Sequence, residues 1–158
     1  MFIVSKSMDT LVESLSNHTE TLIKKLKEIQ KYNFSPNIDL LDFVFFMNQT
    51  SFDIRMFSMD RENNEVFKES LDSSLFAGSQ GIISDVEFRH ILDEQFDEFY
   101  SFYEENEEEL WPKEEKAITE WFLNCWKAAE TDVLKLPSYF VFHDASDSFD
   151  FNLLEMDR

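Results

Sequence analysis

The residues best suited to catalysis or metal binding lie between positions 143 and 150. His143 is followed by Asp144, Asp147 and Asp150. An imidazole beside carboxylates could bind a divalent cation, or His143 could act as a general base. A three-residue spacing, however, aligns ligands on a helix and staggers them across a turn and strand. The favoured interpretation is a turn in which Asp and Ser bind their own backbone, and a small metal-dependent hydrolase is the alternative.

The single cysteine of the chain gives a weaker indication of chemistry. Cys125 lies on an apolar stripe beside Trp126, and no neighbouring base identifies it as a nucleophile. A buried cysteine usually behaves as a small hydrophobic residue. One cysteine cannot form an intramolecular disulfide, and residues 1–6 are too short for the apolar region of a secretory signal. These two features predict a cytoplasmic protein.

Acidic residues are the most prominent feature of the sequence. The 158 residues include 33 Asp and Glu against 14 Lys and Arg, giving a formal net charge of −19. Residues 85–130 hold 15 acidic and 4 basic side chains, so this segment contributes 4 − 15 = −11. The charge is therefore concentrated in less than a third of the chain.

This charge limits the possible partners. Binding to phosphates requires an excess of Lys and Arg, so nucleic acid and anionic membranes are not expected partners. Long-range attraction would instead favour a basic protein. The sequence has no run of about 18 apolar residues, so no membrane span is expected. It also has no cofactor motif, so no cofactor is expected.

The candidate contact residues for a basic protein lie in the most acidic part of the segment. Trp111 follows the acidic run and is expected to be exposed, as suits a residue type enriched in binding hot spots. The full candidate set is Asp93, Glu94, Asp97, Glu98, Glu104, Glu105, Glu107, Glu108, Glu109 and Trp111. The simpler alternative is that these acidic side chains only keep the protein soluble.

The first half of the chain predicts one helix and two or three strands. Four leucines and Ile29 recur at three-, four- and seven-residue steps, which predicts an amphipathic helix over 8–32. The apolar run 40–47 and the alternating pattern at 52–57 predict an antiparallel hairpin, with the first strand buried on both faces. A third strand is predicted over 66–71, and a long loop over 72–84.

The second half predicts two helices and a final hairpin. Ser84 and Glu87 have the spacing of a capping box, so a helix is expected to begin there. Repulsion between the five glutamates of residues 104–109 should fray the end of this helix. Pro112 suits the first turn of a second helix. Strands at 139–143 and 149–153 complete one α+β domain spanning 1–158, with helices packed on an antiparallel sheet.

Three stretches in the last quarter of the chain are WFLNCW at 121–126, LPSYFVFHD at 136–144 and SFDFN at 148–152. They resemble the C-terminal part of small acidic bacterial proteins that act as toxin-immunity proteins. The resemblance implies a cytoplasmic inhibitor that covers the active site of a basic toxin, often a nuclease. It transfers no contact residue to this sequence.

The favoured function is therefore a non-enzymatic acidic module that binds a basic protein. Two alternatives stay open. One is the hydrolase that uses the cluster at His143, and the other is a homo-oligomeric structural protein whose excess of phenylalanine forms an interface.

Overall fold

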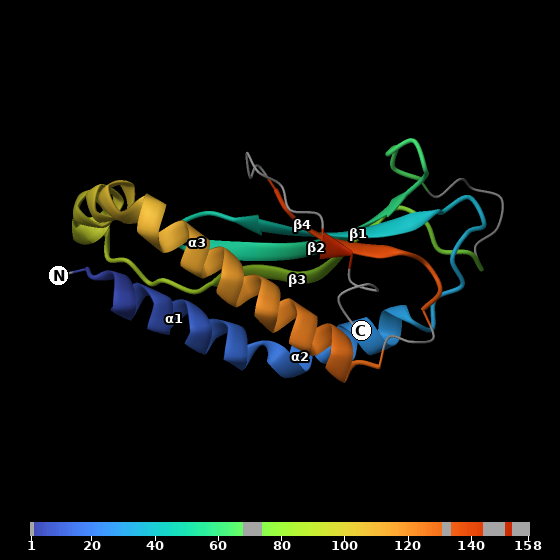
Figure 1. Ribbon diagram of the computed structural model, residues 1–158, viewed down its shortest axis with the longest axis horizontal. Coiled ribbons are helices and arrows are strands. Elements are labelled where there is room, and N and C mark those ends of the chain that lie inside the picture. Colours follow the sequence, from blue (N-terminus) through green and yellow to red (C-terminus); the bar gives the residue numbers. More distant parts are fainter. Residues whose placement is uncertain (1, 68–73, 131–133, 144–150, 153–158) are drawn as a thin grey trace.

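Helices packed on one face of a five-stranded β-sheet make up the fold, as a computed structural model of the chain shows (Figure 1). The structure describes residues 2–67, 74–130, 134–143 and 151–152. Runs of strands alternate with runs of helices, which confirms the predicted α+β class.

Two helices stand where one was predicted over 8–32. Helix α1 is Val4–Asn17 and helix α2 is Thr19–Ile29. His18 leaves helical geometry between them, with φ −107° and ψ 5°, and its Nδ1 lies 2.8 Å from the Ser14 carbonyl oxygen. Asn17, His18 and Thr19 are all weak helix formers. The prediction of a single helix was wrong at this junction.

The predicted hairpin is confirmed. Strands β1 (Leu40–Met47) and β2 (Ser51–Met59) pair antiparallel. The Asn48 carboxamide oxygen closes the turn by accepting hydrogen bonds from the Thr50 and Ser51 amides, at 2.9 and 2.8 Å. Burial alternates along both strands. The prediction that the first strand is buried on both faces was therefore wrong, because Val44 and Phe46 are only half-buried.

The third strand of the sheet is β3 (Ser79–Glu87), which pairs antiparallel with β2. It occupies part of the predicted loop 72–84 and the whole of the predicted capping box. Ile82, Ile83 and Val86 are buried β-branched residues, a type that favours strands, and their packing outweighs the local capping pattern. Val66 and Phe67 lie outside the strands, and the rest of the strand predicted over 66–71 lies outside the described residues.

One continuous helix replaces the two that were predicted. A short 3-10 helix, η1 (Asp93–Gln95), leads into helix α3 (Phe96–Ala128), which has 33 residues and contains Pro112. The acidic run 104–109 does not fray. Its opposite side is buried against the N-terminal segment, and this packing outweighs the repulsion between neighbouring carboxylates.

The sheet is mixed, not wholly antiparallel. Strand β4 (Ser138–Phe142) pairs parallel with β1, and β5 (Phe151–Asn152) pairs antiparallel with β4. This confirms the antiparallel pairing predicted for the final hairpin, whose turn and the rest of its second strand lie outside the described residues. The strand order is β3-β2-β1-β4-β5, so β1 lies at the centre.

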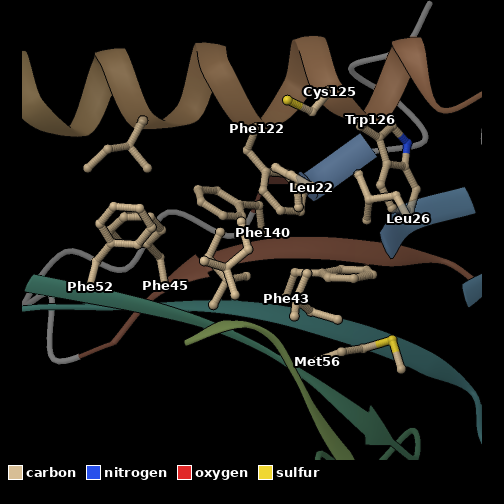
Figure 2. Packing of buried hydrophobic residues seen from close by; sticks show 14 of the residues in the cluster. Leu22, Leu26, Phe43, Phe45, Phe52, Met56, Phe122, Cys125, Trp126 and Phe140 are labelled. Carbon is tan, nitrogen blue, oxygen red and sulfur yellow. The ribbon is translucent and has the colours of Figure 1, made fainter. Parts of the chain in front are cut away.

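The core lies between α3 and α2 on one side and the sheet on the other (Figure 2). Aromatic rings dominate it. The Phe122 ring stacks on Phe140 with centroids 4.4 Å apart, and Phe43 lies 5.5 Å from Trp126. Among the phenylalanines of residues 2–67, 74–130 and 134–143, Phe67 is the one that is exposed. The abundance of phenylalanine thus largely serves the core.

Candidate functional site

The candidate carboxylates form two adjacent stripes on the first half of α3. Residues three, four or seven apart share a helix face. Asp97, Glu104 and Glu108 make one stripe, and Glu98, Glu105 and Glu109 make the next. Glu107 lies at the edge, and Asp93 and Glu94 extend the group onto η1. We call these nine residues the acidic surface.

The whole acidic surface is exposed because the opposite side of the helix is buried. Phe99, Tyr103 and Leu110 form a small apolar cluster there. The Phe2 ring packs on Phe99 edge to face, with ring centroids 5.1 Å apart. This cluster fixes the rotation of the helix about its axis and turns the carboxylates towards solvent.

Few cations of this chain neutralise the acidic surface. Lys113 Nζ lies 3.2 Å from Glu109 Oε1, and this is the one ion pair that the nine carboxylates make within the described part of the chain. Glu104 and Glu108, and likewise Glu105 and Glu109, are like charges four residues apart. Each such pair destabilises a helix by about 0.2–0.5 kcal/mol.

Helix α3 bends between the acidic surface and the sheet. In Figure 1 its yellow part is seen nearly end-on, whereas its orange part lies across the sheet. Pro112 lies inside α3 and cannot donate a hydrogen bond to the Glu108 carbonyl, which is the usual cause of a bend. Tyr103 Oη donates to Glu114 Oε1 at 2.8 Å across the bend. In a straight helix these residues would be about 16 Å apart along the axis, too far for the two side chains to meet.

A buried ion pair holds the inner side of this bend. Arg89 Nη2 donates to Glu114 Oε2 at 2.9 Å, and the two side chains are 4% and 0% exposed. Arg89 also donates from Nη1 to the Gln49 carbonyl at 3.0 Å and from Nη2 to the Ser7 carbonyl at 3.3 Å. The pair therefore ties α3 to α1 and to the β1–β2 turn.

Burial is the largest influence on the pKa values of Glu114 and Tyr103. Desolvation raises the pKa of Glu114 above its ordinary value, although Arg89 and the Tyr103 hydroxyl lower it in part. Burial, followed by the Glu114 charge, raises the pKa of Tyr103. Tyr103 consequently stays a neutral hydrogen-bond donor to Glu114 at physiological pH.

Trp111 is half-buried, which corrects the expectation that it is exposed. Its ring meets Phe142 edge to face, with centroids 5.5 Å apart, and packs against the main core. It lies close in sequence to the carboxylates but anchors α3 to β4. We do not count it as part of the acidic surface.

The alternative cluster is only partly described. His143 is exposed, and its ring lies 4.5 Å from that of Phe46, while Asp144, Asp147 and Asp150 lie outside the described residues. Within the described ranges, no three or more His, Cys, Asp or Glu side chains are grouped so as to hold a metal ion. The hydrolase alternative stays a prediction, because its three carboxylates lie outside the described residues.

Cys125 is a core residue, as its position on the apolar stripe predicted. It is 1% exposed, and burial raises its pKa to about 11. Protonated and enclosed, the thiol lacks the two properties of a reactive cysteine, which are a lowered pKa and access to solvent.

Sequence reasoning missed the buried pair of Arg89 and Glu114. One signal was available: Leu110, Glu114 and Ile118 follow each other at four-residue steps, so Glu114 lies within a buried stripe. The position of its partner carried no such signal, because Arg89 follows β3 in an irregular segment.

Comparisons with known proteins add no family. No family model, characterised protein or solved structure matches this chain. Among the helices of the described residues, none is long and apolar enough to cross a membrane.

Proposed function

We propose that this protein is a non-enzymatic binding module whose acidic surface docks on a basic region of another protein. One observation carries the proposal: nine exposed carboxylates lie on η1 and the first half of α3, with one lysine paired to them. A surface of one charge sign speeds encounter with an oppositely charged partner and helps to set its orientation.

The energetics of α3 support this proposal. The acidic run costs the helix stability through its like-charge pairs, and the buried cluster of Phe99, Tyr103 and Leu110 holds it helical nonetheless. The carboxylates are thus presented on a firmly packed element. Rigid presentation lowers the entropy lost when a partner binds.

The resemblance to toxin-immunity proteins suggests a more specific role. We propose that the partner is a basic toxin, such as a nuclease, and that the acidic surface occupies its cationic substrate site. Binding there would inhibit by competition with an anionic substrate. The identity of the captured partner tests this role separately from binding itself.

The proposed experiment compares two variants of equal net charge. In the first, Glu104, Glu105, Glu107, Glu108 and Glu109 are all changed to Lys. In the matched control, five exposed carboxylates outside the acidic surface are changed to Lys: Asp9, Glu13, Glu20, Glu62 and Glu130. Each tagged protein captures partners at low salt, and the captured protein is identified, purified and titrated over a salt series.

We expect a basic partner that binds the parent protein and the control variant but not the first variant. Its affinity should fall as salt rises, because screening weakens charge attraction. Equal loss in both variants would mean that net charge alone matters and would contradict the proposal. An affinity that changes neither with salt nor with the charge reversals would also contradict it. A solution mass above that of the monomer would favour the homo-oligomeric alternative.

A further inference from the structure

An exposed aromatic side chain borders the acidic surface. Tyr100, on α3, is 44% exposed, whereas most aromatic rings in the described part of the chain are buried or half-buried. The ring of Phe96, one turn earlier, stacks on it with centroids 5.8 Å apart and planes inclined by 17°. Figure 1 shows this part of α3, in yellow, at one end of the molecule and beyond the β-sheet. The Tyr100 ring is therefore within reach of a large partner.

Helix geometry explains why Tyr100 is exposed. It follows the buried Phe99 by one residue, which turns its side chain by about 100° around the helix axis and out of the apolar cluster. Its ring still meets that of Phe99 edge to face, with centroids 6.0 Å apart. The contacts with Phe96 and Phe99 restrict the Tyr100 ring before any partner binds. Binding at this ring would therefore cost little side-chain entropy.

Two carboxylates of the acidic surface are neighbours of Tyr100. Asp97 precedes it by three residues and Glu104 follows it by four, spacings that bring Cβ atoms to about 5–6 Å from each other on one helix face. Neither carboxylate makes an ion pair within the described ranges. Glu104 also lies beyond the first turn of α3, where the positive end of the helix dipole no longer opposes a bound cation. The ring thus has a carboxylate without a counter-ion before and after it along the helix.

This combination suits arginine better than lysine. A guanidinium is planar, so its face stacks on an aromatic ring while its edge donates two hydrogen bonds to one carboxylate. An ammonium group is strongly hydrated and acts as a point charge, so it gains less from the ring. At an exposed site the contact between a cation and an aromatic ring gives about a two- to fivefold gain in affinity. An aromatic ring beside a carboxylate can therefore distinguish two side chains of equal charge.

We propose that Tyr100 is the point at which the acidic surface recognises an arginine of its protein partner. The guanidinium would stack on the Tyr100 ring, with Glu104 as its main acceptor and Asp97 adding charge. This inference rests on the proposed docking function, which by itself needs only positive charge on the partner. It adds a chemical preference, because the surface would bind arginine more tightly than lysine at the same position.

Two synthetic peptides of equal charge test this preference. One is acetyl-Gly-Arg-Gly-Arg-Gly-Arg-amide, and the other has lysine in place of every arginine. Their affinities for the full-length protein are measured by calorimetry at low salt, and the ring signals of ¹³C-labelled tyrosine are followed by nuclear magnetic resonance. We expect the arginine peptide to bind at least threefold more tightly than the lysine peptide. It should also shift the Tyr100 ring signals, which Tyr100→Ser identifies by their loss.

Variants at and near the ring locate the preference. Tyr100→Ser should lower the ratio of the two affinities at least twofold, whereas Tyr100→Phe, which keeps the ring, should retain it. Phe67→Ser, at an aromatic side chain that is 68% exposed and lies outside α3, should also retain it. Glu104→Gln and Glu105→Gln remove equal charge, but only the first should lower the ratio, because Glu105 lies on the other stripe of the acidic surface.

The possible failures separate this inference from the docking function. Equal affinity of the two peptides for the parent protein would contradict arginine recognition and leave the docking function standing. A preference that survives Tyr100→Ser would also contradict it, since the carboxylates alone would then supply the preference. If neither peptide bound at low salt, the proposed docking function itself would be wrong, and the inference would be lost with it.

Discussion

At the scale of single residues, Arg89 has the largest expected effect on stability. Arg89→Met removes the counter-ion of the fully buried Glu114 and takes donors from the Gln49 and Ser7 carbonyls. Breaking a buried ion pair from one side costs about 3–5 kcal/mol. We expect a loss of this size in the free energy of unfolding, measured by urea denaturation at pH 7.

The pH dependence of this loss identifies Glu114 as its cause. The folded-state pKa of Glu114 lies above its ordinary value of 4.5, so its contribution to stability is present at low pH and is lost as pH rises. Without Arg89 the folded-state pKa of Glu114 rises further, so stability is lost over a wider range of pH. The difference in the free energy of unfolding between the parent protein and Arg89→Met should therefore increase from pH 4 to pH 8. Arg61→Met, at a largely exposed arginine, should show almost no effect at any pH.

Cys125 gives a second test at this scale. With its pKa at about 11, about one thiol in a thousand is ionised at pH 8, and the core covers the sulfur. Native protein should therefore resist iodoacetamide for hours, whereas protein in 6 M guanidinium should react within minutes, as measured by intact mass. Rapid labelling of the native protein would show that this part of the core opens readily.

Individual residues were predictable where burial followed periodicity. Cys125 and Trp126 lie on an apolar stripe, and both are buried as expected. Trp111 was not predictable, because its neighbours in sequence are acidic while its neighbour in space, Phe142, lies on a distant strand. The Arg89–Glu114 pair joins residues 25 positions apart, and the pattern of neither segment reveals the other.

At the scale of elements, the acidic part of α3 should gain stability from a single reversed charge. Glu108→Lys replaces repulsion from Glu104 with attraction in the favourable orientation, glutamate first and lysine four residues later. We expect the free energy of unfolding to rise by about 0.5–1 kcal/mol, measured by thermal and urea denaturation.

A reversal elsewhere on α3 provides the control. Glu120→Lys places a lysine four residues after Lys116, so it should destabilise by a few tenths of a kcal/mol. If the first variant were destabilised as well, repulsion within the acidic run would not be the governing term. If Glu108→Lys also weakens partner binding, the acidic run trades helix stability for recognition.

Local patterns predicted some elements and misplaced others. The β1–β2 hairpin was predictable because alternation and a turn occur within 20 residues. Strand β3 was not, because a capping-box pattern at Ser84 and Glu87 competes with strand pairing that only the fold supplies. Pro112 predicted a helix start, but a long helix tolerates an internal proline when tertiary contacts hold both of its halves, as the Tyr103–Glu114 hydrogen bond does here.

At the scale of the whole molecule, the net charge of −19 should make stability depend on salt. The screening length falls from about 30 Å at 0.01 M to about 8 Å at 0.15 M. Repulsion between distant carboxylates is then largely removed, so the melting temperature should rise by a few degrees over this range, measured by circular dichroism at 222 nm.

The acidic surface should account for much of that rise. A variant with Glu104, Glu105, Glu107, Glu108 and Glu109 all changed to Gln should melt higher at low salt and respond less to added salt. An unchanged salt response in this variant would mean that the repulsion is spread evenly over the molecule.

The α+β class followed from the order of helical and strand patterns along the chain. The parallel pairing of β1 with β4 did not follow, because pairing direction depends on how α3 carries the chain back across the sheet. The acidic surface was predictable as a set of residues. Its exposure and rigidity depend on the cluster at Phe99, whose contact with Phe2 joins segments far apart in the sequence.

The central position of β1 bears on how the molecule assembles. Leu41 pairs with Ser138, so 138 − 41 = 97 residues separate the partners of this ladder, whereas the β1–β2 ladder closes locally. Contacts of such long range form slowly. We expect the first hairpin to form early and β4 to join last, leaving one edge of β1 open to other chains in the interval. Dilute conditions or a chaperone should then raise the refolding yield by protecting this edge until β4 arrives.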